Sequence, residues 1–298
     1  MASLLSAGIG YAFTTGFPAL EVAPPMQSAG AIALCVLMLL AGRSPIRRYR
    51  SAMWVLIGRL AGGNAIGAVV YPFAVQRLTL GTVAAFVVIG YLSVGITRIW
   101  RMRATAWGFK HLCGRVLVLG GVIMLNRPQG EIEVVGILCA AVSAWCAWNT
   151  VTVLGRMKKH GQEDQGATIA NLLAAPPLFV AVFALRGGEW MSWGLFSVAG
   201  LAGLLTLLLP VLLMNAALRR SSELDVAMMQ SLSSPIHALV AQVGTAMGAL
   251  ASNQRLTFGE WAAILLVAGA AIGVSSLKEP SDGMLHDGKQ HSGNGRRR

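Results

Sequence analysis

Two apolar runs joined by a basic connector, AIALCVLMLLAGRSPIRRYRSAMWVLIGRLAG (31–62), decide the fold of this chain. Runs of roughly twenty apolar residues have the length that an α-helix needs to cross the hydrocarbon core of a bilayer. Inside lipid, every backbone N–H and C=O must be hydrogen-bonded within the protein, which leaves only helices or a closed barrel. Because these runs are continuous instead of alternating, and rich in Ala, Leu and Gly, they predict transmembrane helices.

The same pattern extends over the whole chain. Hydrophobic residues make up 55% of its 298 residues and charged residues only 12%, whereas a soluble domain carries about a quarter charged residues. So little charge cannot cover a water-facing surface, and we predict an all-α, polytopic membrane protein with ten transmembrane helices. The predicted spans are about 3–20, 25–42, 53–76, 79–97, 107–126, 134–155, 167–185, 194–217, 224–250 and 258–277, the first of them short.

Basic residues are concentrated in every second connector. They are Arg43, Arg47, Arg48 and Arg50 after the second span, Arg98, Arg101, Arg103 and Lys110 after the fourth, Arg156, Lys158 and Lys159 after the sixth, and Arg219 and Arg220 after the eighth. Positively charged connectors stay in the cytoplasm, so both termini are predicted to be cytoplasmic. Topology thus accounts for the net charge of +12, and nucleic acid is not an expected partner.

A faint internal repeat divides the chain. AVQRLTLGTVA (74–84) aligns with ALRRSSELDVA (217–227). Each repeat would hold five spans, and an odd number places the two halves in opposite orientations, as in the inverted repeats of many transporters. The predicted units are a five-helix repeat over 1–130, a second five-helix repeat over 131–278, and a disordered, basic cytoplasmic tail over 279–298.

The ninth span is the most polar. Gln230, Ser234 and His237 follow an i, i+4, i+7 spacing and share one helical face, so they are candidates for binding a solute or, at His237, a proton. A structural, hydrogen-bonded histidine is the other interpretation. Pro235, and Pro210 in the eighth span, cannot donate to the carbonyl four residues back, which predicts helix kinks. The carbonyls that they free either line a cavity or find partners in the packing.

Polar residues also occur in other spans. Trp145 and Asn149 lie four apart in the sixth span, where an aromatic ring and an amide suit a polar solute, although helix–helix contact explains Asn149 equally well. Asn64, Asn171, Asn215 and Gln242 hold similar positions, each open to a cavity-lining or a structural interpretation.

Two arginines and several glycines lie inside the spans. Arg59 and Arg115 are expected to extend along their helices to the cytoplasmic surface. Glycines spaced four apart, which let helix backbones approach closely, predict tight packing. The glycine pairs are Gly58 and Gly62, Gly63 and Gly67, Gly244 and Gly248, and Gly269 and Gly273.

The sequence contains no pattern typical of an enzyme. It has no CxxC, no Cys/His metal spacing and no GxxxxGK[ST] loop, so neither a metal, a cofactor nor direct use of ATP is expected. No nucleophile–base pair stands out, and connectors are too short for a soluble catalytic domain. The expected partners are a small-molecule solute and the lipid bilayer, with a second copy of the chain as a candidate.

The stretch AALRRSSELDVAMMQSLSSPIHALVAQVGTAMGALASNQRLTFGEWAAILLVAGAAIGV (216–274) carries a family resemblance. A basic residue follows an Ala-Leu pair, a proline interrupts the ninth span, and Arg-Leu-Thr precedes a Gly-rich last helix. This order resembles the end of the EamA repeat of the drug/metabolite transporter superfamily. Phe17-Pro18 and the GGN at 62–64 look closest to bacterial threonine/homoserine exporters, but Ser234 stands where those exporters commonly have a glutamate.

The resemblance implies a secondary transporter of the cytoplasmic membrane. It would export amino acids like threonine and homoserine, or related small metabolites, by alternating access. The solute cavity would be built from the third, sixth, eighth and ninth spans. The alternative is a membrane protein without transport activity, a scaffold or degenerate member of the family.

Overall fold

The structure, a computed structural model, describes residues 19–44, 49, 51–78, 80–125, 133–185, 193–232, 235–236, 239 and 258–277. All regular secondary structure in these residues is helical, which agrees with the predicted all-α class. The first predicted span, most of the ninth, the tail, and the candidate residues Ser234 and His237 lie outside the described residues.

Among the residues that the structure describes, six helices are long and apolar enough to cross a bilayer. They are α2 (Ala19–Leu40), α3 (Ser51–Arg77), α6 (Ala106–Leu125), α7 (Val134–Lys158), α8 (Glu163–Leu185) and α13 (Phe258–Ser275). Each begins and ends within six residues of a predicted span. The chain is therefore a polytopic membrane protein.

The fourth and eighth predicted spans, and the described start of the ninth, consist of shorter helical pieces. The fourth is divided into α4 (Leu80–Leu92) and α5 (Ile96–Arg101), the eighth into α9 (Trp193–Gly203), the π-helical turn η1 (Leu204–Leu208) and α10 (Leu209–Arg220), and the ninth begins with α11 (Glu223–Gln230). A single unbroken helix over 79–97 is thus wrong. The break falls at Gly95, whose φ of 65° is left-handed and where a Cβ would lie 2.2 Å from Cδ2 of Leu224, so glycine is required there.

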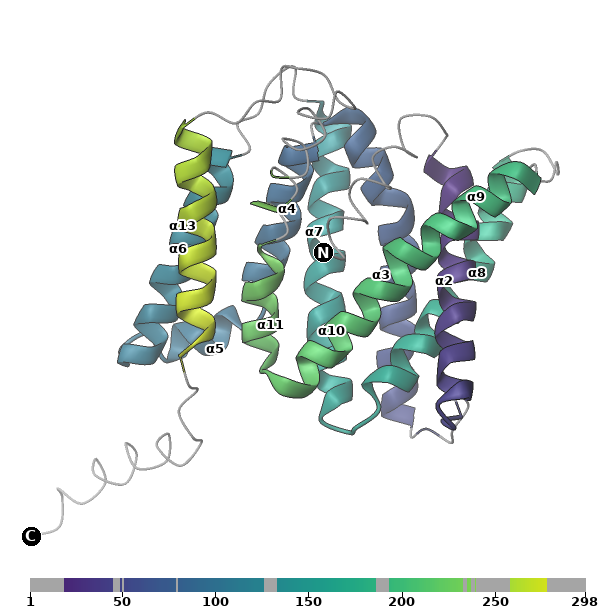
Figure 1. Ribbon diagram of the computed structural model, residues 1–298, viewed down its shortest axis with the longest axis horizontal. Helices are drawn as coiled ribbons and strands as arrows, with labels where there is room; N and C mark the ends of the chain where they lie inside the picture. The colour runs from purple at the N-terminus through teal and green to yellow at the C-terminus, as the bar shows by residue number, and fades with distance from the viewer. Residues whose placement is uncertain are drawn as a thin grey trace, which may run out of the picture.

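The helices form one elongated bundle (Figure 1). α6 and α13 pair at one end of it, and α2, α8 and α9 pack together at the other. α7 runs through the middle, packed between α3 and α4, while α9 and α10 slant across the front. The end of α2, the start of α3, the connectors α7–α8 and α10–α11, and α5 lie at the lower end in Figure 1. The members of the four basic groups that the structure describes belong to this end.

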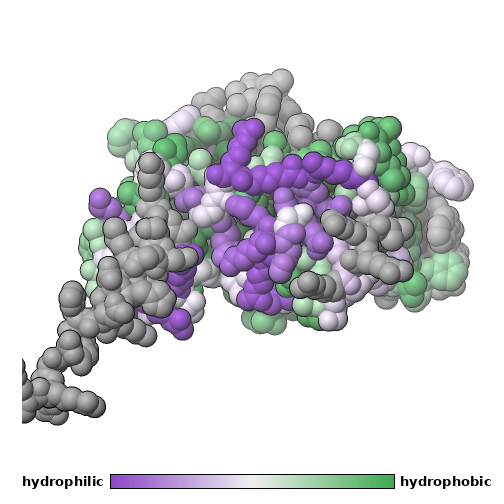
Figure 2. All heavy atoms as spheres, turned by 90° about the horizontal axis from the view of Figure 1, so that it is seen from below, coloured by the Kyte–Doolittle hydropathy of each residue, from purple (hydrophilic) through white to green (hydrophobic). Residues whose placement is uncertain are grey.

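The distribution of polar and apolar residues on the surface is the one expected of a protein surrounded by lipid. Seen from below, hydrophilic residues fill the middle of the lower end and hydrophobic residues lie around its rim (Figure 2). Large apolar side chains also face outward along the spans, among them Val116, Val180 and Leu265. Such a band would be a liability in water, but it is what a helix presents to lipid.

One glycine pair of α3 lies directly against side chains of α7. A Cβ on Gly63 would lie 2.6 Å from Nδ2 of Asn149, and one on Gly67 would lie 3.4 Å from Cβ of Cys146. Gly58, Gly62, Gly269 and Gly273 have no such neighbour within 4 Å. Of the pairs within the described residues, only Gly63 and Gly67 therefore serve as a packing face between helices.

Gly63→Ala is expected to lower the thermal unfolding midpoint, because the added methyl group displaces the Asn149 amide. Overpacking of this kind costs about 1–3 kcal/mol. Gly62→Ala is the matched control, since its Cβ would enter open space and both changes carry the same gain in helix propensity. Thermal unfolding of the two variants in detergent measures the difference, and equal midpoints would contradict the packing role of Gly63.

Candidate functional site

Amide side chains, buried at Gln27 and Asn171 and partly buried at Asn64, join α2, α3 and α8. Oδ1 of Asn171 accepts hydrogen bonds from Nε2 of Gln27 and from Nδ2 of Asn64, each at 2.8 Å. Nδ2 of Asn171 donates to the carbonyl of Ala167, also at 2.8 Å. Polar groups at membrane depth are costly and usually face partner helices or a cavity. Here the amide of Asn171 links three helices through one acceptor.

A second polar contact joins α3 to α7. Nε of Arg59 donates to Oδ1 of Asn149 at 2.5 Å, and Nδ2 of Asn149 donates back to the carbonyl of Arg59 at 3.2 Å. The Arg59 guanidinium lies 5.1 Å from the centre of the Trp148 ring, a cation–π distance. Arg59 is therefore partly buried and points inward, which corrects the expectation that it reaches the cytoplasmic surface. The amide and the aromatic face replace the water it would find there.

These two groups together form the candidate site, which we call the polar seam. Its members, contributed by α2, α3, α7 and α8, are Gln27, Arg59, Asn64, Trp148, Asn149 and Asn171. The seam offers one cation, one aromatic face and four amides. That chemistry suits a polar solute with hydrogen-bonding or carboxylate groups.

The other predicted site residues are distributed around the seam. Trp145 is 43% exposed, whereas Asn149 is fully buried, so Trp148 is the aromatic residue of the seam. Asn215 is buried in α10, and its Oδ1 accepts no hydrogen bond from the part of the chain that the structure describes. Gln230 is half-buried at the end of α11.

The two prolines predicted to kink their helices, Pro210 and Pro235, lie in different local structure. Pro210 is the second residue of α10, directly after the π-helical turn η1. Irregular hydrogen bonding next to a proline follows from its missing N–H. Pro235 is buried and helical, but its neighbours Ser233, Ser234 and His237 lie outside the described residues.

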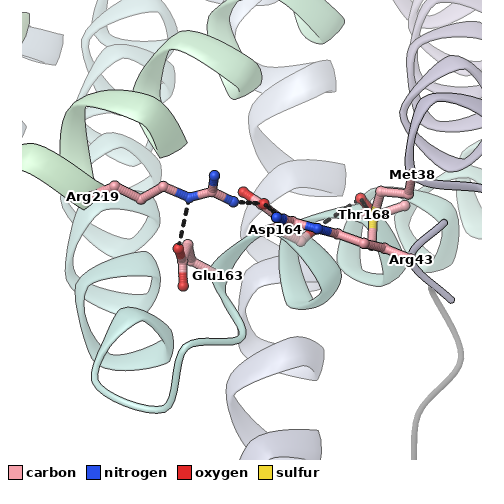
Figure 3. Close-up of polar contacts among 6 residues, drawn as sticks. All are labelled: Met38, Arg43, Glu163, Asp164, Thr168 and Arg219. Carbon is pink, nitrogen blue, oxygen red and sulfur yellow. Dashed lines mark hydrogen bonds and ion pairs between the residues drawn. The ribbon is translucent and has the colours of Figure 1, made fainter. Parts of the chain in front are cut away.

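A cluster of four charges lies at the lower end of the bundle (Figure 3). Nη1 of Arg43 lies 3.1 Å from Oδ2 of Asp164, and Nε of Arg219 lies 3.1 Å from Oε1 of Glu163. Nη2 of Arg219 also contacts Oδ2 of Asp164, so this one oxygen is shared by both arginines. The ion-pair cluster thereby joins the connector after α2 to α8 and α10.

The ion-pair cluster has a local sequence cause. Glu163 and Asp164 occupy the first turn of α8 and Arg219 the last turn of α10, where the helix dipoles favour these charges. The Glu163 side chain is only 9% exposed. With Gly161 and Gln165, the four charged residues line a pocket of about 390 Å³. In the sequence, the signal for this cluster is the acidic pair Glu163 and Asp164, which follows an otherwise basic connector.

Arg115 also departs from expectation. It is 4% exposed, and Nη1 donates to the carbonyl of Leu92, the last residue of α4. A carbonyl at a helix end has no partner within its helix and carries the negative end of the helix dipole. That end of α4 attracts the guanidinium inward, so Arg115 does not extend to the surface.

Comparisons with known proteins bear on the fold alone. No protein-family model matches the chain, and no curated protein matches it either. Within the described residues, no group of three or more His, Cys, Asp or Glu could hold a metal ion. A solved crystal structure of a protein is similar to this chain with a TM-score of 0.65 and 18% identity, over 92% of this chain and 93% of the other. The bundle is thus a fold already seen in a solved structure of nearly equal length.

Proposed function

We propose that this chain is a secondary transporter of the cytoplasmic membrane, which exports amino acids or related small polar solutes by alternating access. The observation that carries the proposal is the polar seam, a buried set of amides with an inward-pointing arginine between membrane-spanning helices. A bundle built only for stability would fill this space with apolar side chains, because polar groups at this depth are expensive unless they are used. The resemblance to threonine/homoserine exporters supplies the solute class.

The pattern of helix contacts supports ten spans arranged as an inverted repeat. If the second half repeats the first, α8 corresponds to α2, α13 to α6, the α9–η1–α10 unit to α3, and α11 to α4. The corresponding helices α2 and α8 pack together, as do α6 and α13. The contact between α3 and α8 has its counterpart in the contact of α9 and η1 with α2. The contact between α4 and α6 has its counterpart in the contact between α11 and α13. Each of these four contacts thus has the counterpart expected of a twofold relation, whereas the first span, which would correspond to α7, lies outside the described residues.

The charge distribution supports an orientation with the lower end in the cytoplasm. The connectors at that end carry the basic residues, and positive connectors are retained inside. The ion-pair cluster then lies at the cytoplasmic mouth. In this mechanism it holds the mouth closed while the seam faces outward, and its rupture admits solute from the cytoplasm.

Uptake into inverted membrane vesicles tests the proposal. Vesicles containing the chain are expected to accumulate one or more members of a labelled amino-acid panel, threonine and homoserine first, above vesicles that lack it. A pH gradient applied in one arm shows whether protons drive the transport. If correctly inserted protein accumulates no member of an amino-acid and metabolite panel, the export proposal fails, and the scaffold alternative takes its place.

A further inference from the structure

One face of α6 carries three buried polar side chains that the polar seam does not include. Trp107, His111 and Arg115 follow an i, i+4, i+8 spacing, which places them in a row along the helix. They are 9%, 1% and 4% exposed. The Trp107 and His111 rings lie 4.2 Å apart between centroids. We call this row the α6 donor stripe.

Most hydrogen-bonding groups of the stripe have no partner. Arg115 uses Nη1 for the carbonyl of Leu92. Its Nε and Nη2, both ring nitrogens of His111 and Nε1 of Trp107 make no hydrogen bond with any residue that the structure describes. An unpaired buried donor is costly, and an unpaired buried charge more so. A guanidinium within a membrane span therefore calls for a counter-charge.

The stripe ends near the middle of the membrane. Arg115 is the tenth residue of a 20-residue helix, about 14 Å along its axis at 1.5 Å per residue. Two shorter helices stop at this level, α4 at Leu92 and α11 at Gln230, and their ends pack with α6 and α13 in one apolar cluster. Interrupted helices in corresponding positions of two halves are where transporters bind charged ligands.

The chemistry of the stripe selects an anion. Arg115 and Trp107 can only donate hydrogen bonds, and His111 can donate one from its ring. Asp225 of α11 carries a negative charge that acts on His111. Its carboxylate accepts from the backbone N–H and the hydroxyl of Ser222 in a capping box, and within the described residues it makes no hydrogen bond with the stripe. We propose that Arg115, His111 and Trp107 bind a small monovalent anion, either chloride or the carboxylate group of a solute. No residue of this site belongs to the polar seam, although Trp148 of the seam packs against the same apolar cluster as Trp107.

Iodide quenching of tryptophan fluorescence tests the site on the purified full-length chain in detergent, at constant ionic strength. Because Trp107 is buried, free iodide in solvent should quench it little, whereas iodide bound beside it quenches strongly. We expect a saturable component of quenching that disappears in Trp107→Phe and weakens roughly tenfold or more in Arg115→Gln, which loses the charge-assisted contacts. Arg103→Gln is the control, since Arg103 is an exposed arginine stacked over Trp100.

Competition identifies the source of the anion. Displacement of iodide by chloride but not by acetate assigns a halide site, and displacement by acetate or formate assigns a carboxylate site. If Arg115→Gln does not fold, the wild-type competition together with His111→Phe decides the question. Quenching that is linear in iodide and equal in the wild type, Trp107→Phe and His111→Phe would overturn the proposal. None of these readouts depends on transport, so the export proposal and this one can fail separately.

Discussion

Asn149→Ala is expected to reduce solute flux by roughly 10- to 100-fold without preventing membrane insertion. Asn149 is buried and is bonded to Arg59 in both directions, through Nε and through the backbone carbonyl. Removing the amide leaves a partly buried guanidinium without its acceptor, which costs about 1–3 kcal/mol. Flux of the solute accumulated by inverted vesicles is the measurement, normalised to the amount of inserted protein.

Two further variants separate solute binding from helix packing. Arg59→Lys keeps the charge but loses the planar group that bonds Asn149 and stacks on Trp148, so its flux is expected to fall nearly as far. Trp148→Leu should reduce flux more than Trp145→Leu, because only the Trp148 ring lies over Arg59. Normal flux in Asn149→Ala, or a larger loss in Trp145→Leu, would show that the seam only holds helices together.

The long spans could be predicted because one local quantity, the hydropathy of about twenty consecutive residues, determines them. Twenty apolar residues bounded by charge must form a helix in lipid, and the predicted 53–76 became α3 (Ser51–Arg77). A hydropathy average does not detect a break inside an apolar run. The fourth span therefore read as one helix, although Gly95 ends it where Leu224, from the other half of the chain, leaves no room for a side chain.

The polar contacts depend on partners that are distant in sequence. Asn149, a predicted candidate, lies 90 residues from Arg59, so spacing alone could not show that they bond. The sequence predicted that Arg59 and Arg115 extend to the surface. In the structure, Arg59 instead bonds the amide of Asn149, and Arg115 bonds the carbonyl of Leu92 at the end of α4. The same spacing rule selected Trp145, whereas the packing of α7 against α3 brings Trp148 to the site.

Only part of the ion-pair cluster could be predicted from the sequence. The acidic pair at the start of α8 is apparent in the sequence, but Arg43 lies 121 residues before Asp164 and Arg219 lies 56 residues after Glu163. Only the fold brings these charges to one end of the bundle. Their proposed function, closure of the cytoplasmic mouth, can be tested directly.

Asp164→Asn is expected to open the cytoplasmic mouth more often. Oδ2 of Asp164 is shared by Arg43 and Arg219, so neutralising this one residue weakens two ion pairs that join α8 to the connector after α2 and to α10. Exposed pairs contribute up to about 1 kcal/mol each. Loss of both would shift the opening equilibrium by roughly 5- to 30-fold, which is about 1–2 kcal/mol.

Thiol labelling measures this shift. Gln165→Cys, in a chain whose native cysteines are replaced, places a thiol in the lining of the pocket, and a membrane-impermeant maleimide applied from the cytoplasmic side reports its exposure. Labelling should accelerate in Asp164→Asn. It should not accelerate in Glu133→Gln, which breaks the comparable 3.1 Å pair of Glu133 with Arg77 at the start of α7, where Glu133 is 51% exposed.

Exchanging the charges of Glu163 and Arg219 tests their pair directly, because the exchange reverses this pair and loses only the contact of Arg219 with Asp164. Glu163→Arg and Arg219→Glu should each accelerate labelling, since each places two like charges where Nε and Oε1 now lie 3.1 Å apart. The double variant should recover part of the slow rate, and the coupling between the two changes gives the contribution of the pair. If the double variant labels as fast as the sum of the single changes predicts, Glu163 and Arg219 are neighbours without a gating role. The cytoplasmic closure must then be sought in the apolar packing of α8 against α2.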